Sequence, residues 1–196
     1  MKVVGLVCSP RKRGNTEILV EEALAAVREL GGETELITVA DKNIRPCDGC
    51  ASCRETGVCH IDDDMQEIYR QLDQADGLIF GTPVYFSNVS AQAKTVMDRT
   101  YAFLQVRKLR GKVAAAMVAA RRIGAGQVLG LLYTYFVVHR MVVAGGGVGY
   151  GRNRGEVKEG VGGFSSSALE EARAVGRSVA YMIRKVSAES PAKGGL

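Results

Sequence analysis

Short segments typical of strands alternate with segments of helical periodicity along most of this chain. The strand-like segments are residues 2–8, 33–39, 76–82, 112–120 and 140–144, and a helical pattern follows each, beginning near residues 15, 62, 90, 126 and 167. Buried apolar strands between helices are typical of a parallel sheet covered on both faces. The sequence therefore predicts an α/β fold of three layers with five parallel strands.

The length of 196 residues and the 46% hydrophobic content fit one ordinary α/β domain. We expect a single domain over residues 1–186 and a polar C-terminal tail over residues 187–196. Nine glycines fall between residues 145 and 163, and they predict a loop there rather than a packed element. The longest apolar stretches are too short to cross a bilayer, and no apolar signal region begins at Met1, so we expect a cytoplasmic protein without membrane contact.

The charge balance favours anionic ligands. Twenty-six lysines and arginines outnumber 21 acidic residues, which gives a net charge of +5 and favours phosphates or acidic partner proteins. The excess is small and scattered, without an aromatic and basic platform, so nucleic-acid binding is not predicted. His60 and His139 are the two histidines, which argues against histidine triads or histidine metal sites, and His60 is expected to be a bystander beside Cys59.

A basic turn connects the first predicted strand to the first predicted helix. Unpaired backbone amides and the positive end of the helix dipole meet at such a turn. Its side chains add donors for a phosphate, and Arg11 can neutralise a dianion; the donors are Ser9, Asn15 and Thr16. The turn lacks the ending of a Walker loop and the glycine spacing of dinucleotide folds. The alternative is an ordinary turn whose basic residues are solvated.

A second loop, residues 81–88, lies at the carboxyl end of the third predicted strand. Open parallel sheets bind ligands beyond this edge, where the strand order reverses. Exposed backbone between Thr82 and Asn88 can hydrogen-bond the edge of a flat heteroaromatic ring, with Tyr85 or Phe86 shaping the pocket. Core packing is the alternative for these two aromatic residues. The two loops together predict bound flavin mononucleotide (FMN).

Four of the five cysteines, Cys47, Cys50, Cys53 and Cys59, fall within thirteen residues. Ligands so close in sequence converge with little loop-closure entropy, which suits one iron–sulfur cube. A tetrahedral zinc site is the first alternative, although zinc ligands usually come in two separated pairs. A disulfide framework fits poorly, since the cysteine count is odd and the chain can build a core without cross-links. A lobe that has lost its metal is the last alternative.

Together these segments resemble the iron–sulfur flavoproteins of anaerobes, which belong to the flavodoxin-like, NADPH-dependent FMN reductase superfamily. The resemblance rests on residues 9–16, 81–86, 94–99 and the four-cysteine run, and it is strongest over residues 1–104. It implies a flavodoxin-like five-stranded parallel sheet with a cysteine-rich lobe, residues 44–62, inserted after the second strand. It also implies bound FMN, a 4Fe–4S cluster, and a homodimer or homotetramer in which the cluster of one protomer lies near the flavin of another.

The resemblance assigns roles to individual residues. The first turn would hold the phosphate through Ser9, Arg11, Asn15 and Thr16, with Gly14 in the same turn. The second loop would line the flavin ring through Pro83, Val84, Tyr85, Phe86 and Ser87, with Thr82 at its start and Arg122 reaching the ring from the loop after the fourth strand. The cluster ligands would be Cys47, Cys50, Cys53 and Cys59. Cys8 is expected to pack in the core, and no catalytic side chain is predicted.

The main functional expectation is an FMN-dependent oxidoreductase and electron-transport protein. A ferredoxin-like donor would feed the cluster, and the FMN would reduce a downstream acceptor. The first alternative is a cluster-free reductase that takes hydride from NADH or NADPH and reduces a quinone, a nitroaromatic compound or free flavin, with Arg152 or Arg154 meeting a dinucleotide phosphate. The second is a redox-sensing or interaction protein whose oligomeric state changes on cluster assembly.

Overall fold

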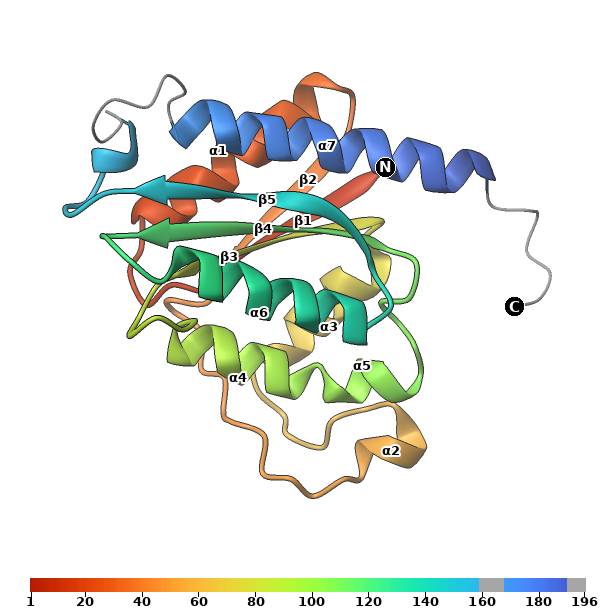
Figure 1. Ribbon diagram of the computed structural model, residues 1–196. Helices are drawn as coiled ribbons and strands as arrows, with labels where there is room; N and C mark the ends of the chain where they lie inside the picture. Colours follow the sequence, from red (N-terminus) through yellow and green to blue (C-terminus); the bar gives the residue numbers. More distant parts are fainter. Residues whose placement is uncertain (159–167, 190–196) are drawn as a thin grey trace.

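The computed structural model describes residues 1–158 and 168–189, and it shows a five-stranded sheet between two layers of helices (Figure 1). The strands are β1 (Lys2–Val7), β2 (Glu33–Thr38), β3 (Gly77–Pro83), β4 (Val113–Ala120) and β5 (Val142–Tyr150), in the order β2-β1-β3-β4-β5. All four pairings are parallel, so every strand ends at the same edge. The order reverses between β1 and β3, which places a crevice at that edge. The predicted three-layer α/β fold is confirmed.

The helices cover the two faces of the sheet unequally. One face carries α1 (Asn15–Glu29) and α7 (Ala168–Glu189), and the other carries α3 (Met65–Gln74), α4 (Ala91–Arg99), α5 (Tyr101–Gln105) and α6 (Ala125–Val138) (Figure 1). A hydrophobic core lies on each face of the sheet, and alternate strand residues point into one or the other. In β1, Val3 and Val7 pack with α1, whereas Val4 and Leu6 pack against the helices of the other face. Burial of both faces explains why the central strands are continuously apolar.

The helical segment predicted to begin near residue 90 is divided into α4 and α5. The break falls at Thr100, whose buried hydroxyl donates a hydrogen bond to the Met97 carbonyl oxygen at 2.7 Å. The same hydroxyl lies 3.0 Å from the hydroxyl oxygen of Tyr135 on α6. A threonine that bonds back to the preceding turn commonly bends a helix, and here it anchors the bend to the core.

The fifth strand is longer than the sequence predicts. β5 continues to Tyr150, so the prediction of a loop from residue 145 is wrong for residues 145–150. A Cβ atom on Gly149 would lie 2.6 Å from Leu19 Cδ1 of α1, and one on Gly146 would lie 2.7 Å from the Tyr133 hydroxyl oxygen of α6. Glycine is needed because helices on both faces approach the strand closely. The predicted loop over residues 159–163 lies outside the described residues.

The cysteine-rich lobe, residues 44–62, leaves the fold after β2 and returns at α3, which confirms an insertion after the second strand. It contains the short helix α2 (Cys53–Thr56) and lies below α4 and α5 in the view of Figure 1. A 3₁₀ turn, η1 (Glu156–Lys158), follows β5. α7 continues through Glu189, into the segment predicted as a tail from residue 187, and residues 190–196 lie outside the described residues. Within the described ranges, no helix has the length and apolar character needed to span a membrane.

His139 follows α6 and is buried, with 6% of its surface exposed and its Nε2 3.2 Å from Thr100 Oγ1. Burial lowers the pKa of this imidazole to about 4. Since the unfolded chain has a pKa near 6.5, the unfolded state binds more protons between these two values. The free energy of unfolding is therefore expected to fall as the pH drops from about 6.5 towards about 4, by up to about 3 kcal/mol.

Urea unfolding of wild type and His139→Gln at about pH 7.5 and about pH 5 measures this contribution. The variant is expected to lose less stability between the two pH values than wild type does. Equal losses in the two proteins would contradict the assignment.

Candidate functional site

The first candidate site forms where β1 meets α1. Ser9 and Thr16 are 4% and 2% exposed, and Arg11 is exposed at the surface of the turn. Ser9 Oγ accepts a hydrogen bond from the Arg11 backbone nitrogen at 3.1 Å, which tightens the turn. The first helical bond of α1 joins the Ile18 nitrogen to the Gly14 carbonyl oxygen, so the amides of residues 15–17 lie ahead of the helical ladder. These amides and the helix dipole form a site for an anion.

The segment after β5 is fastened to this turn. Asn15 Oδ1 accepts a hydrogen bond from the Gly155 nitrogen at 2.7 Å, and its Nδ2 donates to the Asn153 carbonyl oxygen at 2.9 Å. Arg154 Nε donates to the Arg13 carbonyl oxygen at 2.9 Å. The Asn15 side chain therefore positions a loop over the anion site.

Two adjoining cavities follow the carboxyl edge of the sheet. The first, of about 220 Å³, has four arginines in its lining, namely Arg11, Arg121, Arg152 and Arg154. No acidic side chain is among the described residues that line it. The second, of about 290 Å³, shares Val84 and Arg121 with the first and is also bordered by Phe86, Ser87, Arg122 and Ile123. A strongly cationic end beside a partly apolar end suits a ligand that joins a phosphate to a ring system.

The loop after β3 is a tight hairpin. Backbone hydrogen bonds of 2.9 and 3.0 Å pair Tyr85 with Asn88, and Phe86 and Ser87 between them have φ values of 49° and 58°. Two left-handed residues in succession define a two-residue turn of type I′ geometry. The Phe86 side chain at its tip is fully exposed, so the core-packing alternative is wrong for this residue. The hairpin holds its backbone rigid beside the second cavity.

Eleven of the twelve residues predicted for the flavin site line these two cavities. They are Ser9, Arg11, Gly14, Asn15, Thr16, Pro83, Val84, Tyr85, Phe86, Ser87 and Arg122. Thr82 lines neither cavity: it is fully buried, and its Oγ1 accepts a hydrogen bond from the Ser90 nitrogen at 3.2 Å. Its position favours a structural role at the start of α4.

Two arginines of the first cavity are not predicted for the flavin site, namely Arg152 and Arg154. Arg121 belongs to the loop after the fourth strand, which is expected to reach the flavin. Arg152 and Arg154 are expected only as partners of a dinucleotide phosphate, because they follow β5 and the early end predicted for that strand removes them from the carboxyl edge. A strand extended to Tyr150 would have placed them beside the turn after β1.

The second candidate site is a cavity of about 260 Å³ in the cysteine-rich lobe. Four cysteines line it together with residues of α4 and α5, namely Cys47, Cys50, Cys53 and Cys59 with Asp98, Arg99 and Tyr101. All five cysteines of the chain are free thiols. Burial raises the pKa of the Cys53 thiol, and the charges of the other three raise it further. Four thiolates in one small volume repel one another, and a bound metal centre would offset that repulsion.

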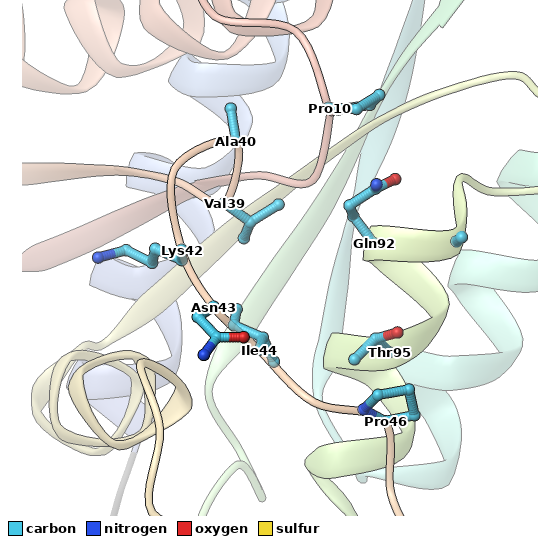
Figure 2. A pocket seen from close by; sticks show the side chains of 10 residues that line it. Pro10, Val39, Ala40, Lys42, Asn43, Ile44, Pro46, Gln92 and Thr95 are labelled. Carbon is cyan, nitrogen blue, oxygen red and sulfur yellow. The ribbon is translucent and has the colours of Figure 1, made fainter.

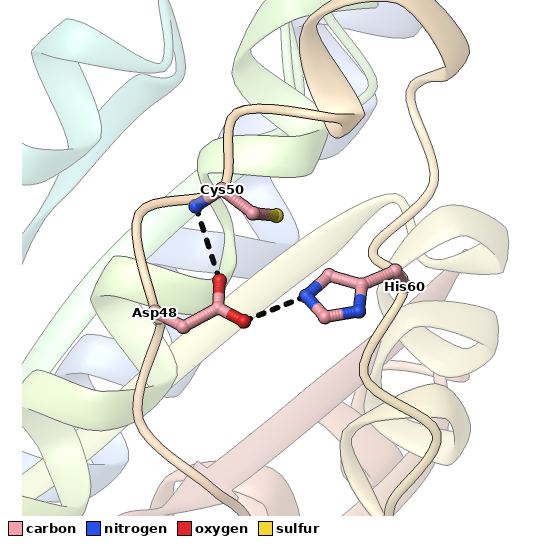
Figure 3. A group of neighbouring side chains, drawn as sticks. All are labelled: Asp48, Cys50 and His60. Carbon is pink, nitrogen blue, oxygen red and sulfur yellow. Dashed lines mark hydrogen bonds and ion pairs between the residues drawn. The ribbon is translucent and has the colours of Figure 1, made fainter.

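Asp48 fixes the loop around Cys50 (Figure 3). One carboxylate oxygen accepts a hydrogen bond from the Cys50 nitrogen at 3.1 Å, and the other lies 2.8 Å from His60 Nε2. The pKa of Asp48 is lowered to about 2, mainly by the hydrogen bond from the Cys50 amide and also by the hydrogen bond with His60. Ligand atoms of Asp48, Cys50 and His60 lie within 4.8 Å of one another. This set shares Cys50 with the four-cysteine cavity.

A third cavity, of about 290 Å³, is lined by residues that are adjacent in sequence to residues of the two candidate sites (Figure 2). Pro10 follows Ser9 of the anion site, and Pro46 precedes Cys47 of the lobe. Lys42 is the one charged residue among its described lining residues, and it is paired with Glu67. No described residue lines both the cysteine cavity and either of the cavities at the sheet edge. Within one chain the two sites are therefore separate compartments.

Cys8 lies in the core with no exposed surface, and burial raises the pKa of its thiol. It is absent from the described lining of the cysteine cavity. The expectation that Cys8 packs in the core is confirmed.

Comparison with known proteins agrees with this geometry. The family model of the NADPH-dependent FMN reductases matches residues 1–153. An iron–sulfur flavoprotein of Methanocaldococcus jannaschii is 42% identical and aligns with 95% of this chain and 99% of its own length. One of Methanosarcina thermophila is 37% identical over 74% of this chain and 78% of its own length. The crystal structure of RosB with a bound formylated riboflavin phosphate covers 96% of this chain and 81% of its own, at a TM-score of 0.78 and 17% identity, a likeness of fold.

The fold and its two sites define a flavin-dependent oxidoreductase of the flavodoxin-like class. The chain belongs to the NADPH-dependent FMN reductase family and, within it, to the iron–sulfur flavoproteins. The predicted family is confirmed, and its cofactors are FMN and an iron–sulfur cluster. The cationic cavity at the helix N-terminus suits the first, and four convergent thiols suit the second.

Gly124 allows the loops after β3 and β4 to touch. It has a φ of 96°, and a Cβ atom there would lie 2.8 Å from Ser87 Cα and 2.9 Å from Val84 Cγ1. Gly124→Ala is expected to push the hairpin away and weaken FMN binding by about tenfold, because a strained left-handed residue costs on the order of 1–3 kcal/mol. Gly126→Ala is the matched control, since no atom lies within 4 Å of the added methyl group.

Fluorescence titration of the two flavin-free variants with FMN measures the difference. Equal dissociation constants for Gly124→Ala and wild type would show that the hairpin does not border the flavin.

Proposed function

We propose that this protein transfers electrons between a 4Fe–4S cluster held by Cys47, Cys50, Cys53 and Cys59 and FMN bound at the carboxyl edge of the sheet. The reduced flavin then passes electrons to a downstream acceptor. The observation that carries the proposal is the convergence of four thiols on one cavity in a chain with a separate, arginine-rich ligand site. A cluster exchanges single electrons and a flavin exchanges one or two, so the pair links a one-electron donor to a two-electron acceptor.

The residues around the sheet edge have distinct roles in this proposal. The amides of residues 15–17 and the Ser9 hydroxyl bind the phosphate, and Arg11 neutralises its charge. Arg152 and Arg154 close the site from the segment after β5. The rigid hairpin from Tyr85 to Asn88 presents backbone groups to the edge of the ring and limits the access of water to it.

We further propose a ferredoxin-like protein as the donor to the cluster. Cys47 and Cys50 are exposed on the lobe, so a small protein can approach the site closely. Because the two sites are separate compartments in one chain, the electron path is completed in a homodimer or homotetramer. The exposed Phe86 beside the second cavity is suited to such a contact.

A second candidate function is direct reduction of the flavin by NADPH. The family model and the arginines at the first cavity favour it, since these side chains can bind the phosphates of a dinucleotide. The same FMN site serves both functions, and only the source of electrons differs.

Cys50→Ala separates the two cofactors. The variant is expected to lose the iron, the sulfide and the visible absorbance of the cluster, because one of four ligands is gone, and to keep one FMN per chain. Cys8→Ala is the matched control, since it removes a thiol that lies in the core. Retention of the cluster in Cys50→Ala, or loss of both cofactors, would contradict the proposed arrangement.

Anaerobic stopped-flow spectroscopy of the same two variants identifies the donor. Reduced ferredoxin is expected to bleach the flavin of Cys8→Ala quickly and that of Cys50→Ala at least about 100-fold more slowly, which corresponds to about 2.7 kcal/mol in the barrier. Fast and saturable bleaching of both variants by NADPH would instead establish the second candidate function.

A further inference from the structure

Arg99 ends α4, and its side chain is completely buried between that helix and the cysteine-rich lobe. Its Nη1 donates hydrogen bonds to the Arg45 carbonyl oxygen at 2.8 Å and to Asp63 Oδ2 at 2.7 Å. Its Nη2 donates to the Ile61 carbonyl oxygen at 3.2 Å and to Asp63 Oδ1 at 3.1 Å. The carboxylate of Asp63 is also buried, with 2% of its side chain exposed. One guanidinium thus holds both ends of the lobe.

The fifth donor of this guanidinium is unused. An arginine has five N–H groups, and the four on Nη1 and Nη2 are accounted for by these four hydrogen bonds. Nε is buried and has no hydrogen-bond partner within the described part of the chain. A buried donor left without an acceptor destabilises a protein, and such a group in a native structure requires an explanation, such as a water molecule, an ion or another group that accepts from it.

The unused donor belongs to a side chain that lines the four-cysteine cavity. Burial alone would lower the pKa of Arg99, but the hydrogen bond with Asp63 and the charges of Tyr69 and Cys59 raise it above its ordinary value. The charge of Cys59 also acts on the Tyr69 hydroxyl, which donates to the Arg99 carbonyl oxygen at 2.6 Å. Arg99 is therefore a permanent cation close to one of the four sulfur atoms. Asp63 is not among the residues that line the cavity, so of the two charged side chains only Arg99 contributes to the cavity wall.

We propose that Arg99 is a positioning residue for the cluster: its Nε–H donates a hydrogen bond to a sulfur atom of the four-cysteine site, and its cation raises the reduction potential of the cluster bound there. The inference rests on the proposed function, because it requires iron at these cysteines. One-electron reduction adds one negative charge to the site, breaks no bond, and leaves Arg99 protonated. Hydrogen bonds to sulfur and a nearby buried cation stabilise the reduced state with respect to the oxidised state.

An anaerobic redox titration with dithionite, followed by electron paramagnetic resonance, tests the proposal on the iron-loaded protein. The double variant with Arg99→Gln and Asp63→Asn removes both charges together, so that no buried charge is left unpaired. It is expected to lower the equilibrium constant for cluster reduction by about tenfold, which is about 59 mV for one electron. Asp63→Asn alone leaves the cation without its counter-ion and is expected to shift the potential by a similar amount in the opposite direction.

Arg54→Gln is the matched control. Arg54 lines the same cavity, but it is exposed, and its Nε donates to the Tyr101 hydroxyl oxygen at 2.9 Å. Because solvent screens an exposed charge, this variant is expected to change the equilibrium constant by less than about threefold.

Iron and sulfide assays on every variant separate the possible failures. Equilibrium constants for cluster reduction within about threefold of wild type in both Asp63→Asn and the double variant, at full iron content, would overturn the role of Arg99 while leaving the proposed function intact. If the double variant fails to hold iron, Asp63→Asn decides: a raised potential supports the proposal, and an unchanged one overturns it. A wild-type protein without iron would overturn the proposed function itself.

Discussion

The ion pair between Arg99 and Asp63 holds the cysteine-rich lobe against the rest of the fold. The lobe contains a single short helix in the described structure, and three of its four metal-site cysteines are not fully buried. The guanidinium of Arg99 brings the two ends of the lobe together. It donates hydrogen bonds to the Arg45 carbonyl oxygen, near the start of the lobe, and to the Ile61 carbonyl oxygen, near the end of the lobe. Both side chains of the pair are shielded from water. A buried pair of this kind contributes little net stability by itself, but the loss of one partner is costly, so the arrangement of the four sulfur atoms depends on both.

The two cofactor sites have different structural origins. The candidate flavin site follows from the fold alone: parallel strands end at one edge, the order reverses between β1 and β3, and the N-terminus of α1 offers backbone donors for a phosphate. The cysteine site is an insertion that the sheet does not require. Since the cofactors supply the redox chemistry, the protein contributes their position, their hydrogen bonds and the surrounding charge. Under the proposal for Arg99, one side chain of a helix that belongs to the sheet domain contributes to all three at the cysteine site.

Local patterns in the sequence were sufficient for most of the fold and for most of the residues that line the candidate cavities. Apolar runs indicate buried strands, and four cysteines within thirteen residues indicate a candidate metal site, because both signals are confined to a short stretch of chain. β5 was predicted too short because Gly145 to Gly149 read as a loop, whereas the close approach of Leu19 and Tyr133 requires glycine in a strand. The pairing of Asp63 with Arg99 spans 36 positions, and no local pattern marks it, because the two residues belong to separate predicted helical segments.

The most direct measurement of the central claim is the cofactor content of the protein purified without exposure to air. The account predicts about four iron atoms and about four sulfide ions for each chain, together with bound FMN and an absorbance spectrum in which both chromophores are present. A colourless protein, or one that contains zinc in place of iron or lacks flavin, would contradict it.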